Sequence, residues 1–151
     1  MIKVLTIFAV FAASVAGAAE GVIGFWKTVD DETKEVKSIV RVYEHEGRVY
    51  GRVVEIFKNP QATAKLPGNP PIKGLDILWN LKKENGSEKY EGGKVLDPQK
   101  GKVYTAQIWR DGDNLVLRGS LFGFGRKQTW LPVQPPIGPL PKLVPSIPVK
   151  D

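Results

Sequence analysis

The chain has 151 residues, a net charge of +6 at pH 7, no cysteine and a single histidine. The absence of cysteine excludes disulfides, metal–thiolate sites and thiol catalysis, and a lone histidine excludes a multi-histidine metal site. The mild positive charge fits simple solubility, or contact with an anionic lipid, polysaccharide or protein.

Residues 1–19 have the pattern of a secretory signal peptide. A short basic start precedes an apolar run from Val4 to Val15, which is too short to span a bilayer, and small residues follow the run. We therefore expect cleavage after Ala18 or Ala19 and a periplasmic or secreted protein. Export argues against a nucleic-acid partner. Because no cysteine is present to carry a lipid, we also expect no stable membrane anchor.

Residues 20–133 have the pattern of a single all-β domain. β-branched and aromatic residues recur in short runs that turn residues interrupt, and no long segment has helical periodicity. Eight such runs, mostly joined by short turns, predict an eight-stranded antiparallel up-and-down β-barrel. The predicted strands span residues 22–29, 36–44, 48–57, 75–82, 89–96, 102–110, 114–121 and 124–133.

The connections between the predicted strands are of two kinds. The second, fourth and sixth have the composition of tight hairpins, at residues 46–47, 85–86 and 111–113. The first is the acidic segment 30–35, and the third is the long segment 58–74. Odd-numbered connections share one end of an up-and-down barrel, so we expect one tightly closed end and one elaborated mouth.

The long third connection carries Lys58, Lys65 and Lys73 and no acidic residue. These lysines favour an anionic group on a ligand that enters the mouth, or they belong to a solvated loop. A loop of this length in a compact domain is often a lid or a binding loop.

Alternation along the strands indicates which side chains face the interior of the barrel. An eight-stranded barrel has room for its own side chains or for one small ligand, so the pattern leaves open whether the barrel is filled. The candidate ligand-binding residues are Val40, Val42, Trp79, Tyr104, Ile108, Leu117, Phe124 and Trp130.

Three further residues are candidates for closing the base of the barrel. Trp26, on the first strand, can cross the closed end and fill it, and Gly24 can let another backbone approach closely. The last strand would lie beside the first and place Arg126 over the Trp26 ring in a cation–π contact. We expect all three to have a structural role.

Residues 134–151 differ in composition from the barrel. They contain six prolines, too many for a strand inside a sheet, which predicts a Pro-rich extended C-terminal tail. Two PxxP spacings, starting at Pro136 and Pro145, offer a ligand for a protein partner. Packing of the tail on its own barrel, or disorder, is the alternative.

Several segments together resemble one known family. Residues 24–30, 43–51, 93–98 and 125–130 and the pair Arg118-Gly119 are similar to the exported bacterial family catalogued as domain of unknown function 2147. The resemblance implies a lipocalin-like (calycin) barrel, whose structural signature includes the Gly-x-Trp opening and a late arginine. The family has no assigned activity, so no mechanism is implied. The cysteine pair that many members carry between the third and fourth strands is absent here.

No catalytic set is evident in the chain. The single histidine, His45, sits beside a tight turn at the predicted closed end, which excludes a Ser-His-Asp triad at the mouth. We expect neither an enzyme nor a cofactor or metal site. Two functions remain: a barrel that holds a small hydrophobic or amphipathic ligand, anionic ones included, or a side-chain-filled barrel that binds a protein through its mouth loops or tail.

Overall fold

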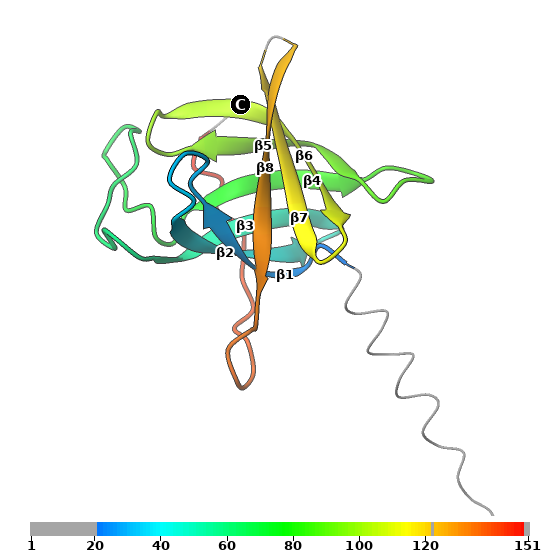
Figure 1. Cartoon of the computed structure of the whole chain (residues 1–151), viewed down its shortest axis with the longest axis horizontal. Helices are drawn as coiled ribbons and strands as arrows, with labels where there is room; N and C mark the ends of the chain where they lie inside the picture. Colours follow the sequence, from blue (N-terminus) through cyan, green and yellow to red (C-terminus); the bar gives the residue numbers. More distant parts are fainter. Residues whose placement is uncertain (1–20, 122, 150–151) are drawn as a thin grey trace, which may run out of the picture.

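Eight antiparallel strands, each paired with the next, form a closed barrel in the computed structural model (Figure 1). The structure describes residues 21–121 and 123–149, without the side chain of Phe124, so the predicted signal peptide lies outside the described residues. Each strand begins and ends within two residues of its prediction, and the predicted fold is confirmed. The strands are β1 (Gly24–Val29), β2 (Val36–His45), β3 (Arg48–Ile56), β4 (Asp76–Lys83), β5 (Tyr90–Asp97), β6 (Lys102–Asp111), β7 (Asn114–Leu121) and β8 (Phe124–Val133).

The pairing of the first and last strands closes the barrel. Phe25 lies opposite Val133, and Lys27 lies opposite Leu131. Closure leaves no free sheet edge, because every strand has a hydrogen-bonded neighbour on both sides. β1 therefore pairs with β2 on one side and with β8 on the other.

Trp26 and Arg110 close the base of the barrel. Trp26 is 3% exposed, and its indole Nε1 donates a hydrogen bond of 3.0 Å to the carbonyl oxygen of Val22. The Arg110 guanidinium lies 5.4 Å from the centroid of the Trp26 ring. Arg110 also donates to the carbonyl oxygens of Gly21 and Gly112, each at 2.9 Å. These bonds compensate for the partial burial of the guanidinium and tie the β6–β7 hairpin to the segment before β1.

The structural reason for a glycine at position 24, two residues before Trp26, differs from the predicted one. Among the described residues, a Cβ at this position would have only the Trp26 Nε1 atom within 4 Å, at 3.9 Å. No backbone approaches closely, so that part of the prediction is wrong. The φ angle of Gly24 is 150°, in a region that L side chains rarely adopt. Glycine is favoured here by the backbone conformation that starts β1.

The C-terminal segment packs along the outer wall of the barrel. Figure 1 shows it, in red, leaving the end of β8 and doubling back along the strands. Arg41 donates a 2.7 Å hydrogen bond to the carbonyl oxygen of Pro141, and Arg52 donates a 2.8 Å bond to that of Val144. We call residues 141–149 the C-terminal strap, because its backbone carbonyl groups attach it to β2 and β3.

A buried carboxylate lies beneath the strap. The Asp76 side chain is fully buried and accepts hydrogen bonds from the Tyr43 hydroxyl at 2.8 Å, Arg52 Nη2 at 3.0 Å and the Ser146 backbone N–H at 2.7 Å. An unpaired carboxylate in this position would be costly, so these donors stabilise the site. Burial raises the pKa of the Tyr43 hydroxyl, and its hydrogen bond to Asp76 raises that pKa further.

Replacing Trp26 tests the role of the plug. Trp26→Ala removes a buried aromatic ring and should lower the free energy of unfolding by about 3–5 kcal/mol. Urea unfolding followed by circular dichroism measures the change. Trp109→Ala is the matched control, because Trp109 is only half-buried and its ring is covered by two lysine side chains. Equal losses in the two variants would contradict the plug assignment.

The raised pKa of Tyr43 predicts that the protein loses stability at alkaline pH. The folded protein keeps a proton on Tyr43 that the unfolded chain releases near the ordinary pKa of 10.0. This contribution to stability is fully present below about pH 10 and is lost as the pH rises above that value. The unfolding free energy of the wild type should therefore fall more steeply above about pH 10 than that of Tyr43→Phe. Urea titrations across this range measure both slopes, and parallel curves would exclude Tyr43 as the cause.

Candidate functional site

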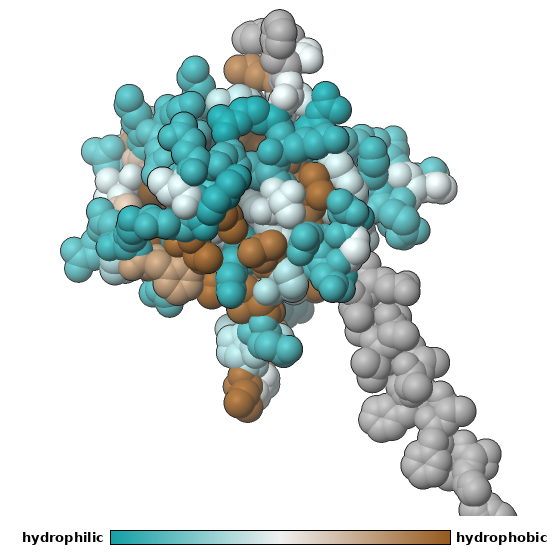
Figure 2. All heavy atoms as spheres, viewed as in Figure 1, coloured by the Kyte–Doolittle hydropathy of each residue, from teal (hydrophilic) through white to brown (hydrophobic). Residues whose placement is uncertain are grey.

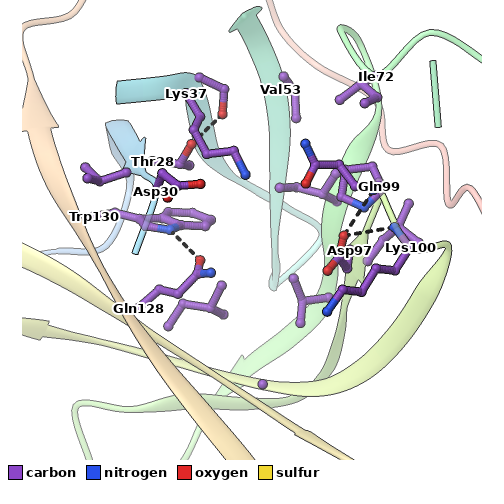
Figure 3. A pocket seen from close by; sticks show the side chains of 18 of the residues that line it. Thr28, Asp30, Lys37, Val53, Ile72, Asp97, Gln99, Lys100, Gln128 and Trp130 are labelled. Atoms are coloured by element: carbon purple, nitrogen blue, oxygen red, sulfur yellow. Dashed lines mark hydrogen bonds between the residues drawn. The ribbon is translucent and has the colours of Figure 1, made fainter. Parts of the chain in front are cut away.

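The mouth of the barrel opens into a cavity of about 960 Å³ (Figure 3). Asp30 and Glu35 of the first connection, Lys58 of the third and Gln99 of the fifth lie around it. Leu121, where β7 leads into the seventh connection, also lines it. As predicted, the odd-numbered connections surround the mouth.

The deeper walls of the cavity are mainly apolar. Trp130 is 2% exposed, and its indole Nε1 donates to Gln128 Oε1 at 3.3 Å, so the buried N–H group has a partner. A Cβ built on Gly119 would lie 3.4 Å from Tyr104 Cβ and 3.5 Å from Val95 Cγ1, so a larger side chain there would extend into the cavity. The other apolar lining residues are Val29, Val36, Val53, Ile56, Ala62, Ile72, Ile77, Leu96, Pro98, Leu117 and Leu121.

Polar side chains become common towards the mouth. The hydroxyl groups of Thr28 and Ser38 share a hydrogen bond of 2.6 Å between β1 and β2 (Figure 3). Asp30 Oδ1 accepts from the backbone N–H groups of Glu32 and Thr33, each at 2.9 Å, which shapes the first connection. These bonds are the main cause that lowers the pKa of Asp30. The cavity thus passes from an apolar floor to a polar, solvated rim.

The lysines of the third connection contribute less free charge than predicted. Lys58 forms an ion pair with Glu35, which raises the pKa of Lys58, and Lys73 lies 3.7 Å from a carboxylate oxygen of Glu55. These two positive charges are therefore matched by acidic side chains on neighbouring segments. With two of its three lysines paired, the loop forms a weaker basic patch than its sequence indicates.

Seven of the eight predicted ligand-binding residues separate into three groups. Tyr104, Leu117 and Trp130 line the cavity. The prediction for Phe124 falls on a side chain outside the described residues. Val40, Val42 and Ile108 are fully buried and lie nearer the closed end, where they fill the barrel rather than line its cavity.

The predicted position of Trp79 in the cavity wall is wrong. Leu78 pairs with Val95, which lines the cavity, whereas Trp79 pairs with Lys94. Directly opposite residues lie on the same face of a sheet, so Trp79 faces away from the cavity although it is fully buried. Simple alternation fails because the β3–β4 register shifts twice and Asn80 adopts a φ of 60°.

The predicted contact of Arg126 with Trp26 is also wrong. β8 runs from the mouth towards the closed end, where Trp26 pairs with Pro132. Arg126 lies near the start of this strand, lines the cavity and forms an ion pair with Asp31, with 71% of its side chain exposed. Arg110, which precedes the sixth connection, occupies the predicted place.

Sequence reasoning missed two lysines at the mouth, Lys37 and Lys100. Lys37 follows the first connection, and Lys100 belongs to the fifth. Their only signal in the sequence is the strand order, which brings these distant connections to the same end of the barrel.

The described residues hold no group of three or more His, Asp or Glu side chains arranged for a metal ion. In the same part of the chain, no helix has the length and apolar character needed to cross a membrane.

The two arginines can be distinguished experimentally. Arg110→Met removes the contact over Trp26 and the bonds to two carbonyl oxygens, and should lower the unfolding free energy by about 2 kcal/mol. Arg126→Met removes an exposed ion pair and should change it by no more than about 1 kcal/mol. Urea unfolding of both variants is the measurement. A larger loss of unfolding free energy in Arg126→Met than in Arg110→Met would favour Arg126 as the residue that covers Trp26.

Comparison with known proteins supports the fold. The model of a family described as uncharacterized protein conserved in bacteria (DUF2147) matches residues 24–131, which confirms the resemblance seen in the sequence. A solved structure, protein HP1028 from Helicobacter pylori, described as belonging to the lipocalin family, matches with a TM-score of 0.64 at 23% identity. The match covers 76% of this chain and 84% of that chain, and it shows a shared fold. No curated protein matches, and neither description names a catalytic activity.

Proposed function

The chain belongs to the DUF2147 family of bacterial proteins, and we propose that it is an exported protein whose barrel binds a small hydrophobic or amphipathic ligand. The observation that carries this proposal is the cavity of about 960 Å³, open at the mouth and closed below by Trp26 and Arg110. A concave, mostly apolar site with a few polar groups is typical of small-molecule binding.

The walls favour an apolar group on the ligand. Val53, Ile77, Val95, Leu117 and Trp130 come from five different strands and meet around the deeper part of the cavity. Transfer of apolar surface from water into such a site contributes about 25 cal/mol per Å². A ligand with an apolar body therefore binds by the hydrophobic effect, without a covalent or metal-assisted step.

The rim favours a polar group at the other end of the ligand. Lys37, Gln99 and Lys100 lie where the cavity meets solvent, so a polar or anionic end can stay hydrated while the apolar part is buried (Figure 3). An amphipathic molecule matches this gradient better than a uniformly polar one.

The alternative function, an interaction module with a filled barrel, has less support because the half of the barrel near the mouth is open. Its remaining support is the loop between β8 and the strap, where Ile137 is fully exposed. Figure 2 shows hydrophobic atoms at the tip of this projecting loop. A protein partner of the tail would contact this loop. Such an interaction is compatible with ligand binding in the barrel.

Export is proposed from the pattern of residues 1–19. Export argues against a nucleic-acid partner despite the net charge of +6.

Native mass spectrometry of the protein purified without denaturation tests the proposal. We expect a stoichiometric small-molecule adduct that solvent extraction removes. Gly119→Leu should abolish the adduct, because its side chain enters the space between Tyr104 and Val95. Thr105→Leu is the control, since Thr105 is exposed and lies outside the cavity.

The thermal unfolding midpoint of each variant establishes that it is folded. A wild-type protein that carries no adduct and binds no added hydrophobic probe would refute the carrier function. An adduct that persists in folded Gly119→Leu would show that the ligand lies elsewhere.

A further inference from the structure

Two cationic side chains from different parts of the sequence line the mouth of the cavity. Lys37 belongs to β2, and Lys100 belongs to the turn between β5 and β6. Both line the cavity, and Figure 3 shows their side chains extending from opposite walls. Barrel closure therefore places one ammonium group on each of two opposite walls, above the apolar floor.

The backbone under each lysine is held in place. Asp97 Oδ1 accepts the backbone N–H groups of Gln99 and Lys100 at 3.0 and 3.2 Å, which shapes the β5–β6 turn. The same turn is joined to the third connection by a 2.8 Å bond from the Lys65 N–H to the Pro98 carbonyl oxygen. The Lys37 carbonyl group accepts a bond from the Phe57 N–H. Both lysine side chains therefore start from backbone that hydrogen bonds hold in place.

The other charged groups of the rim already have partners. Lys58 is paired with Glu35, and Arg126 is paired with Asp31. The carboxylates of Asp30 and Asp97 each accept two backbone N–H groups.

Lys37 also attracts Asp30 through its charge, which is the weakest of the causes that lower the pKa of that carboxyl. In the part of the chain that the structure describes, Lys37 and Lys100 form no ion pair within 4.0 Å.

We propose that Lys37 and Lys100 form a subsite for the anionic head group of a single-chain amphiphile whose apolar chain occupies the cavity. This inference rests on the proposed function and names the class of its ligand. Each ammonium group offers three donors, and a carboxylate, sulfate or phosphate head can accept from both lysines. The head group stays at the solvated rim, so its charge is not buried at a large cost.

A matched pair of probes tests the subsite. Lauric acid and lauryl alcohol have the same chain and differ in the charge of the head at neutral pH. Isothermal titration calorimetry with the full protein should show about tenfold tighter binding of the acid, from two charge-assisted contacts at a partly solvated rim. Added salt should reduce the difference in affinity between the acid and the alcohol, because salt screens exposed charges.

The variants identify the groups that are responsible. The double variant Lys37→Gln with Lys100→Gln should bind the acid about tenfold more weakly and the alcohol as the wild type does. Lys82→Gln is the matched control, because Lys82 is an exposed lysine near the closed end of the barrel and lines no part of the cavity. Its affinities for both probes should be unchanged.

Each other outcome overturns a defined part of the proposal. Equal affinities of the wild type for acid and alcohol, or an acid preference that survives in the double variant, would refute the lysine subsite and leave the carrier function standing. Binding of neither probe, nor of any apolar dye, by the folded wild type would refute the carrier function and the subsite with it.

Discussion

The hydrogen-bonded pairing of β1 with β8 is the constraint on which the rest of the structure depends. Closure of eight strands leaves an interior with room for side chains or for one small ligand. Trp26 and Arg110 occupy the base, and Val40, Val42 and Ile108 fill the region above it. The remaining volume lies at the mouth, so the position of the plug determines where a ligand can bind.

The polar groups of the domain are arranged around this apolar interior. Outside the wall, Asp76 and Arg52 form a buried ion pair that the C-terminal strap covers through Ser146 and Val144. At the mouth, ion pairs neutralise Lys58 and Arg126, and the carboxylates of Asp30 and Asp97 accept backbone N–H groups. Among the described residues of the cavity lining, Lys37 and Lys100 are the cations without an ion pair within 4.0 Å. The strap thus contributes to the stability of the barrel, and the two lysines contribute to its proposed ligand selectivity.

The shared fold with a lipocalin-family protein sets the scaffold and does not by itself set the ligand. One barrel topology supports many ligands, because the side chains that line the cavity and its rim differ between members. In this chain the informative features are local: Gly119 leaves space beside Tyr104, and Lys100 extends from a turn that Asp97 holds. Ligand selectivity therefore depends on these residues.

The sequence by itself determined the eight strands and the two kinds of turn, because strand periodicity and turn chemistry are local signals. Only the tertiary structure decided which arginine covers Trp26, which face Trp79 occupies and which lysines remain unpaired at the mouth. Barrel closure brings Arg110 rather than Arg126 to the base. The irregular register around β4 changes the face on which Trp79 lies, and ion pairs with distant acidic residues neutralise Lys58 and Lys73. These outcomes depend on contacts between segments far apart in the chain, which no local pattern encodes.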